Sequence, residues 1–177
     1  MFAVRATKYD PTKRDARGIF HINEWTSISD IGKTFDGKEL TPEDYLQMED
    51  AYIAAIFQLL EATGLSCLAI ELLENKMGPD ARRSLQQLDT WQLRKKLGAI
   101  AIEGELDLEG IELISRLSLR EALWCKLKGD HATYVHFGWD YYMYLGTERE
   151  GACLGSPPSG MHFETLKSPY AQTFYEG

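Results

Sequence analysis

The stretch that decides the fold class runs from residue 123 to residue 146 and reads LWCKLKGDHATYVHFGWDYYMYLG. Aromatic and β-branched residues dominate it, and such residues favour strands. The dipeptide Gly129-Asp130 is a turn signal between two of its strand-like segments. We therefore expect a hairpin and then a third strand, in the ranges 123–128, 133–137 and 140–145. The C-terminal half of the domain should consequently contain an antiparallel sheet.

Outward from this region, toward the N-terminus, the clearest helical signal begins at Thr41. Thr41 is a good capping residue, Pro42 suits the first helical position, and two acidic residues follow in the first turn. One face of the segment carries, at spacings of three and four residues, Glu43, Gln47, Asp50, Ala54, Gln58 and Glu61. The other face is apolar, and Gly64 is a natural C-cap. The pattern predicts a helix over 42–62 that packs against a sheet or other helices.

The remaining segments mix both kinds of element. Strands or helices are predicted for 2–9, 28–33, 66–73, 80–97 and 107–117. The first of these favours a strand and the others favour helices, except that 66–73 is compatible with either. A Ser118-x-x-Glu121 capping box predicts one more short helix. The whole pattern predicts a single α+β domain over 1–145, with a loop-rich tail, 146–177, packed on the same domain.

Length and composition describe one ordinary globular domain. The chain has 177 residues, of which 44% are hydrophobic and 26% charged, so neither disorder, collagen nor a coiled coil is expected. Its 19 basic and 27 acidic residues give a net charge of −8, which disfavours general binding to a nucleic acid backbone. No apolar run is long enough to span a membrane. We therefore expect neither a nucleic acid nor a membrane as a direct partner.

The N-terminal sequence and the cysteines indicate a compartment. Charged residues interrupt the first ten positions and no small-residue cleavage site follows, so no signal peptide is predicted. The cysteines form an odd and widely spaced set, Cys67, Cys125 and Cys153, which suits reduced thiols better than a disulfide framework. Both features predict a cytoplasmic protein.

The acidic excess is concentrated in two regions. Residues 41–78 contain seven acidic side chains and one basic one, a net charge of −6 that falls largely on the predicted 42–62 helix. A second cluster of carboxylates has no base within it and comprises Glu103, Glu105, Asp107, Glu109 and Glu112. A compact acidic surface attracts a basic partner and raises the rate of association. The alternative is a solvated helix face beside an ordinary acidic loop.

No motif for a metal, a cofactor or a catalytic nucleophile accompanies these clusters. The carboxylates between 103 and 109 alternate without the glycine-bent spacing of a calcium loop, and the histidines lack zinc-ligand spacing. Glycine motifs for phosphate binding and the GxSxG nucleophile motif are absent from the sequence. The sequence therefore predicts a protein that has no metal or cofactor and is not an enzyme.

One alternative is a small thiol enzyme. With Gly129-Asp130 as a two-residue turn, Cys125 faces Tyr134, and His136 lies diagonal to Cys125 on the same sheet face. Cys125, His136 and Asp140 then have the residue types of a nucleophile, a base and an orienting acid. An oxyanion hole is not recognisable, and a buried cysteine beside a hydrogen-bonded strand histidine is the competing interpretation.

Another alternative is a binding module for a small ligand. The segment 137–144 is rich in aromatic side chains, which are Phe137, Trp139, Tyr141, Tyr142 and Tyr144. Such rings are suited to stacking on a nucleotide base, and the neighbouring cations in the sequence are Lys126 and Lys128. Aromatic strands otherwise form sheet cores or protein interfaces.

Two parts of the chain resemble known sequences, namely EWTSISDIGKTF at 24–35 with LTPEDY at 40–45, and HFGWDYYMYLG at 136–146. They are similar to an uncharacterised family of small bacterial cytosolic proteins. Members of that family look like immunity proteins of polymorphic or contact-dependent growth inhibition toxin systems. The resemblance implies an acidic protein that binds and occludes the active site of a toxin domain, and it brings no catalytic residue.

The charge pattern agrees independently with that implication, because the site at which a nuclease toxin binds nucleic acid is basic. We therefore expect a basic protein partner, a cognate nuclease toxin. The expected contact residues are the carboxylates of 103–112 or those of the helix face 43–61.

Overall fold

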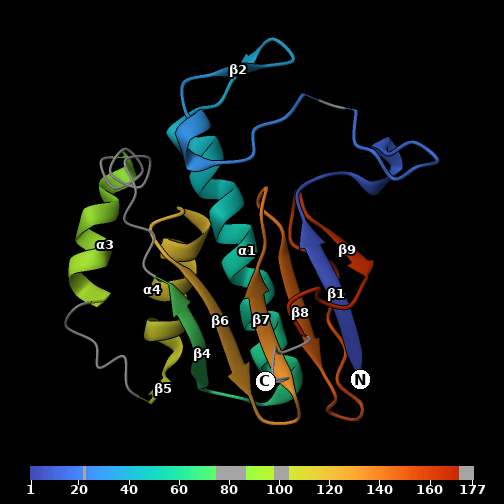
Figure 1. Cartoon of the computed structure of the whole chain (residues 1–177), viewed down its shortest axis with the longest axis vertical. Helices are drawn as coiled ribbons and strands as arrows, with labels where there is room; N and C mark the ends of the chain where they lie inside the picture. Colours follow the sequence, from blue (N-terminus) through green and yellow to red (C-terminus); the bar gives the residue numbers. More distant parts are fainter. Residues whose placement is uncertain (22, 75–86, 98–103, 172–177) are drawn as a thin grey trace, which may run out of the picture.

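The computed structural model describes residues 1–21, 23–74, 87–97 and 104–171. Within these ranges a seven-stranded sheet forms the centre of the molecule, in the order β5-β4-β6-β7-β8-β1-β9, and every neighbouring pair is antiparallel (Figure 1). Its strands are β1 (Phe2–Thr7), β4 (Leu68–Glu74), β5 (Glu105–Leu106), β6 (Trp124–Gly129), β7 (Thr133–Phe137), β8 (Met143–Thr147) and β9 (His162–Thr165). A separate ribbon is formed by β2 (Thr34–Phe35) and β3 (Lys38–Glu39).

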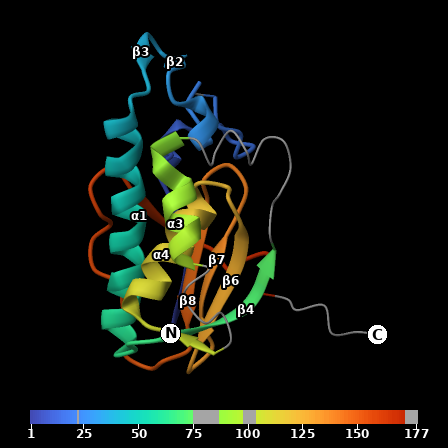
Figure 2. The ribbon, with the colours of Figure 1, turned by 90° about the vertical axis from the view of Figure 1, so that its left-hand side faces the viewer.

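The helices lie on one side of this sheet (Figure 2). They are α1 (Pro42–Thr63), α3 (Thr90–Leu97) and α4 (Leu108–Leu119), and the 3-10 turns are η1 (Pro11–Lys13), η2 (Ile28–Asp30) and η3 (Gln87–Asp89). Helices α1 and α4 pack on the sheet, and α3 packs on α4. The chain is therefore an α+β domain, as predicted. We name the covered side of the sheet the helix-side face and the other side the outer face.

Helix α1 confirms the helix predicted over 42–62. The Thr41 side chain accepts a hydrogen bond from the Asp44 amide at 3.1 Å. Gly64 ends the helix with a left-handed φ of 64°, which lets its amide donate to the last helical carbonyls. The largest fully buried side chains of α1 are Tyr45, Tyr52, Ile56 and Leu59. Their burial against the sheet supplies the stability that a lone amphipathic helix lacks in water.

Alternation along the strands separates two sets of side chains. On the helix-side face, Leu127, Val135 and Leu145 are opposite one another on β6, β7 and β8 and are fully buried. On the outer face, Tyr134 and His136 of β7 come between these positions. The two faces therefore differ in the side chains that they carry, and only the helix-side face is covered by helices.

The β6–β7 hairpin forms, but the predicted two-residue turn at Gly129-Asp130 is wrong. Gly129 pairs with Thr133, so the loop holds three residues rather than two. Within this loop His131 and Ala132 have positive φ angles of 54° and 49°. An alanine rarely adopts this conformation, so the sequence gives no signal for it.

The longer loop changes the cross-strand partners. Tyr134 lies opposite Lys128, and not opposite Cys125 as predicted. Gly129 stays inside β6, where a Cβ atom would lie 2.8 Å from a methyl group of Leu68. Glycine is therefore favoured at this position by close packing rather than by a turn.

Two further predictions about elements are wrong. The strand predicted over 140–145 begins only at Met143, because Asp140 and Tyr141 have positive φ angles of 54° and 63° that no strand contains. The short helix predicted from Ser118 and Glu121 does not form. Ser118 lies inside α4, where its hydroxyl donates to a carbonyl one turn earlier instead of capping a new helix.

The remaining segments follow the predicted pattern more closely. Segment 66–73 is a strand, and the helix predicted over 107–117 is α4. Helix α3 is the described end of the helix predicted within 80–97, and the part of that range before residue 87 lies outside the described residues. The tail from 146 contributes more than loops, because β9 pairs with β1 at the edge of the sheet. None of the helices in the described ranges has the length and apolarity needed to cross a membrane.

Candidate functional site

The carboxylates predicted at 103–112 are spread over several elements. Glu105 is on β5, and Asp107 caps α4 by accepting a hydrogen bond from an amide of its first turn at 2.9 Å. Glu109 follows within that first turn, and all three side chains are exposed. Glu103 lies outside the described residues. The cluster therefore surrounds the N-terminus of α4, where negative charge is favourable.

Glu112 takes part in an ion cluster that joins α4 to α1. Nη2 of Arg116 lies 2.9 Å from Oε1 of Glu112 and 2.8 Å from Oδ1 of Asp50. The side chain of Asp50 is 64% exposed and that of Glu112 is 40% exposed. The acidic face of α1 and the acidic residues of α4, which the sequence suggested as separate surfaces, thus meet at Arg116. We name this set the acidic helical surface, and it comprises Asp50, Glu105, Asp107, Glu109 and Glu112.

Beneath this surface the fully buried Glu49 binds two arginines. Its carboxylate accepts a hydrogen bond from Arg116 at 2.6 Å and two from Arg120 at 2.6 and 2.8 Å. Arg120 is 5% exposed and also donates to the Leu88 carbonyl at 2.9 Å. Burial alone lowers the pKa of Arg116, but its carboxylate partners outweigh this and raise the pKa above its ordinary value. The cluster therefore fixes α1, α4 and η3 relative to one another.

A second candidate site lies on the outer face of the sheet. A cavity of about 770 Å³ opens there, within the size range of small-molecule sites. Its lining includes the side chains of Phe2, Glu71, Lys128, Tyr134, His136, Lys167 and Tyr170. These residues are far apart in the sequence, which explains why sequence reasoning missed the site as a whole.

His136 forms part of the floor of this cavity. It is only 3% exposed, its Nδ1 lies 2.8 Å from Oγ of Ser168, and its ring stacks on Tyr134 with centroids 4.6 Å apart. Its Nε2 lies 3.8 Å from Oε2 of Glu71. Burial, with a smaller effect from the Lys126 charge, lowers the pKa of His136 to about 4. The imidazole is therefore neutral at pH 7 and can both donate and accept a hydrogen bond.

Residues 166–171 form a strap over part of the outer face. The strap is attached at Ser168, which contacts His136, and at Tyr170, whose carbonyl accepts a hydrogen bond from Nζ of Lys126 at 2.9 Å. Its first residue, Leu166, donates to the Ala3 carbonyl at 3.1 Å. The strap thus continues the edge of the sheet and then forms one wall of the cavity.

The aromatic residues of 137–144 fit the sheet-core interpretation better than the alternative of a stacking platform. Phe137 and Tyr141 are buried in the hydrophobic core. The aromatic side chains that line the outer-face cavity include Phe2, Tyr134 and Tyr170 instead. Alternation along β7 turns Phe137 to the helix-side face, and the left-handed φ angles at Asp140 and Tyr141 take that part of the chain out of a regular strand.

The residues of the alternative thiol enzyme do not come together, and the competing interpretation of a buried cysteine and a hydrogen-bonded strand histidine describes them instead. Cys125 is fully buried on the helix-side face, with Sγ 3.2 Å from Oγ of Ser118, and burial raises the pKa of its thiol to about 12. His136 is on the outer face, and Asp140 is exposed in the loop before β8. A protonated thiol behind the sheet cannot transfer a proton to this histidine.

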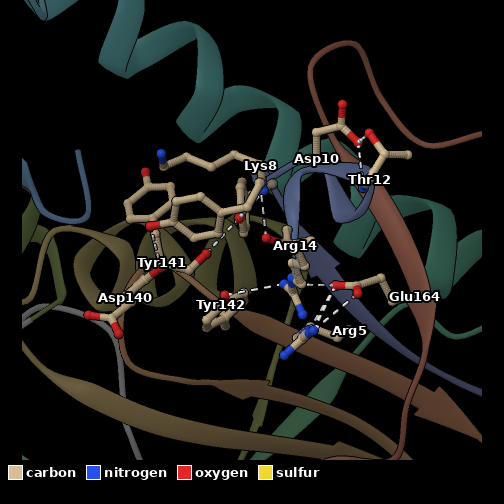
Figure 3. A network of polar contacts seen from close by, with 12 residues as sticks. Arg5, Lys8, Asp10, Thr12, Arg14, Asp140, Tyr141, Tyr142 and Glu164 are labelled. Carbon is tan, nitrogen blue, oxygen red and sulfur yellow. Dashed lines mark hydrogen bonds and ion pairs between the residues drawn. The ribbon is translucent and has the colours of Figure 1, made fainter. Parts of the chain in front are cut away.

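A polar network attaches the N-terminal segment to the edge of the sheet formed by β9 (Figure 3). Arg5 and Arg14 share the Glu164 carboxylate, at 2.9 and 3.4 Å. Nη2 of Arg14 also lies 3.3 Å from the Tyr142 hydroxyl, and the Arg5 guanidinium lies over the Tyr142 ring. The network joins β1, β9 and the loop after η1, so we assign it a structural role.

Lys8 continues this network into an aromatic cage. Its Nζ lies 2.9 Å from Glu24 and over the rings of Tyr9 and Trp25, 4.1 and 4.2 Å from their centroids. Burial lowers the pKa of Lys8, and the Glu24 carboxylate partly opposes that effect. The Lys8 side chain itself occupies the cage. The cage therefore holds the segment around Trp25 in place and is not open to a ligand.

Within the described ranges, no group of three His, Cys, Asp or Glu side chains is arranged to hold a metal ion. A scan against protein-family models, a search of curated proteins and a search of solved structures each returned no match. The acidic helical surface and the outer-face cavity are therefore the two candidate sites in the described part of the chain.

Proposed function

We propose that this chain is a cytosolic binding protein of the immunity type, whose acidic helical surface docks onto a basic protein and occludes its active site. A nuclease toxin domain fits that description, since it must bind nucleic acid through basic side chains. The net charge of −8 and the resemblance of 24–45 and 136–146 to immunity-type proteins support the proposal.

The observation that carries the proposal is the junction of two acidic helix faces at Arg116. Arg116 holds Asp50 and Glu112 within 2.9 Å of its own Nη2, and the buried Glu49 anchors Arg116 from below. Carboxylates that are already ordered lose less conformational entropy when a partner binds. An acidic surface of this kind also steers a basic partner toward it before contact.

Binding requires no reacting group, and this agrees with the positions of the candidate catalytic residues. Cys125 is buried against α4, whereas the ring of His136 faces the opposite side of the sheet. Substituting either residue by alanine is therefore expected to change stability, while protection against a toxin is retained in whatever fraction stays folded. Loss of protection with the fold intact, judged by circular dichroism, would favour the enzyme alternative.

The test is binding kinetics against the product of the adjacent gene, captured with the tagged chain. The variant Glu105→Lys with Glu109→Lys should slow association, because both carboxylates are exposed and have no capping role. The wild-type on-rate should fall steeply as salt rises, since the Debye length shrinks from about 30 Å at 0.01 M to about 10 Å at 0.1 M. Asp107 is left unchanged because it caps α4.

The matched control is Glu39→Lys with Glu74→Lys, which reverses two exposed carboxylates, one on β3 and one at the end of β4 that does not pair with β5. It changes the net charge equally, so it measures the effect of overall charge alone. The proposal predicts a much larger reduction of the on-rate for the Glu105 and Glu109 pair. Equal effects of the two double variants, or an on-rate that is independent of salt, contradict it.

A further inference from the structure

The outer-face cavity is separate from the acidic helical surface, because the sheet lies between them. A β-bulge in β4 shapes its wall, since Ile70 pairs with Leu127 and Leu72 pairs with Lys126, leaving Glu71 as the extra residue. Bulges turn a side chain away from its regular direction. Here the bulge brings the Glu71 carboxylate next to the cavity and to the ring of the buried His136.

Glu71 and His136 do not satisfy each other's hydrogen-bonding capacity. Their closest atoms are 3.8 Å apart, which is longer than a hydrogen bond, so a polar edge that lies alongside the pair can contact both. Oγ of Ser168 accepts from the Tyr170 amide at 3.1 Å and lies 2.8 Å from Nδ1 of His136. We infer that the Ser168 hydroxyl donates to Nδ1 of His136. The neutral ring then carries its proton on Nε2, and this N–H is directed toward Glu71. A ligand edge with an acceptor beside a donor matches this pair.

The aromatic side chains of the cavity favour a flat ligand. The Tyr134 ring leans across β8 over Gly146, where a Cβ atom would lie 2.4 Å from Cζ of that ring. The Tyr134 ring thus occupies the space that a side chain at position 146 would take. Tyr134 is partly exposed in the cavity, and Tyr170 lines it from the strap. Aromatic side chains in such positions stack on nucleobases.

Two exposed cations complete the site, Lys128 on β6 and Lys167 on the strap. We propose that the outer-face cavity binds a nucleoside monophosphate. The base stacks against Tyr134 and directs its hydrogen-bonding edge to Glu71 and His136, and the phosphate lies toward the two lysines. Every nucleobase carries an acceptor next to a donor on its pairing edge. The Glu71–His136 pair therefore fits nucleoside monophosphates as a class and does not specify which base is bound.

The test is calorimetric titration of the full chain with adenosine monophosphate, adenosine and ribose 5-phosphate. Adenosine monophosphate should bind at one site, adenosine more weakly, and ribose 5-phosphate not at all at the same concentrations. The cytidine, guanosine and uridine monophosphates, titrated in parallel, identify the preferred base. If no nucleotide binds saturably, or if ribose 5-phosphate binds as tightly as the nucleotides, the proposal is overturned.

Two carboxylate variants distinguish recognition of the base by Glu71 from a general effect of charge on nucleotide binding. Glu71→Gln should weaken nucleotide binding about tenfold, because it removes a charged acceptor of the base edge. Glu148→Gln removes the same charge from another part of the cavity lining, after β8, and should change binding less than twofold. Equal effects of the two variants would rule out recognition by Glu71.

Tyr134→Leu should also weaken binding about tenfold or more, through lost stacking. If that variant does not fold, Glu71→Gln still decides the matter, because Glu71 is at an exposed position of β4. Lys128→Ala with Lys167→Ala should weaken binding of the monophosphate without changing that of adenosine. The Glu105→Lys and Glu109→Lys variant should bind nucleotide normally, so this proposal and the proposed protein partner fail independently.

Discussion

The two faces of the sheet satisfy their polar groups in different ways. On the helix-side face α1 and α4 bury the apolar side chains, and the buried Glu49 has three hydrogen bonds from two arginines. On the outer face the cover is a short strap, and the buried His136 keeps Nε2 3.8 Å from Glu71. The buried charges of the first face are paired within the chain, whereas the second face leaves polar atoms available to a ligand.

This difference separates residues that support the fold from residues that offer a site. Substitutions under the helices should change the free energy of unfolding strongly. Substitutions that line the cavity should change binding first and stability less.

The largest effect is expected for Glu49→Ala. The variant leaves Arg120, which is 5% exposed, without its carboxylate, and an unpaired buried charge costs about 3–5 kcal/mol of stability. The adjacent Asp50→Asn removes an ion pair that is largely solvated and should cost less than about 1 kcal/mol. Urea denaturation of both variants measures the difference. A loss for Glu49→Ala that is as small as that for Asp50→Asn would show that the buried cluster is not needed.

A smaller effect is expected from His136 when the pH is lowered. Its folded-state pKa of about 4 is below its ordinary value of 6.5, so the unfolded chain binds this proton more readily. The stability that comes with the neutral ring is fully present above about pH 6.5 and is lost as the pH falls toward 4, by about 2–3 kcal/mol.

Urea denaturation of the wild type and of His136→Gln between pH 7 and pH 4 tests this expectation. Glutamine does not titrate, so the variant should lose less stability over the same interval. Carboxylates with lowered pKa values, such as Asp30 and Asp44, affect both proteins equally and cancel in the comparison. Parallel curves for the two proteins would assign the acid sensitivity to other groups.

The smallest effect compares two neighbouring positions of α1. Ala54→Gly and Ala55→Gly should each lose about 1 kcal/mol from helix propensity. Ala55 is fully buried whereas Ala54 is exposed, so Ala55→Gly should lose about 1 kcal/mol more through its packed methyl group. Thermal or urea unfolding measures the difference between the two variants. Equal losses would mean that the methyl group of Ala55 contributes little to packing.

The elements that sequence reasoning predicted well are those with local signals. Helix α1 has its cap at Thr41, its stop at Gly64 and a continuous apolar face between them. The β6–β7 hairpin was recognised from its composition, but its register depends on positive φ angles at His131 and Ala132. The surrounding structure imposes this conformation on the alanine, so no sequence pattern predicts it.

The candidate sites were predictable only in part, because both are assembled from distant residues. The acidic cluster around α4 was visible in the sequence, but its junction with Asp50 depends on Arg116, which follows 66 positions later. The outer-face cavity depends on the bulge at Glu71 and on a strap from the end of the chain. Neither a bulge nor a strap has a sequence signature that single-sequence reasoning can use.

The position of β1 has a consequence for biosynthesis. This strand is the first to leave the ribosome, yet its partners in the sheet are β8 and β9, which are among the last. At about 5–20 residues per second, roughly ten seconds separate Thr7 from Met143 on a translating ribosome. During that interval the backbone of β1 has no native partner within the described sheet, so chaperone binding and aggregation of the nascent chain should depend on residues 2–7. Long-range pairing of this kind also slows folding after release.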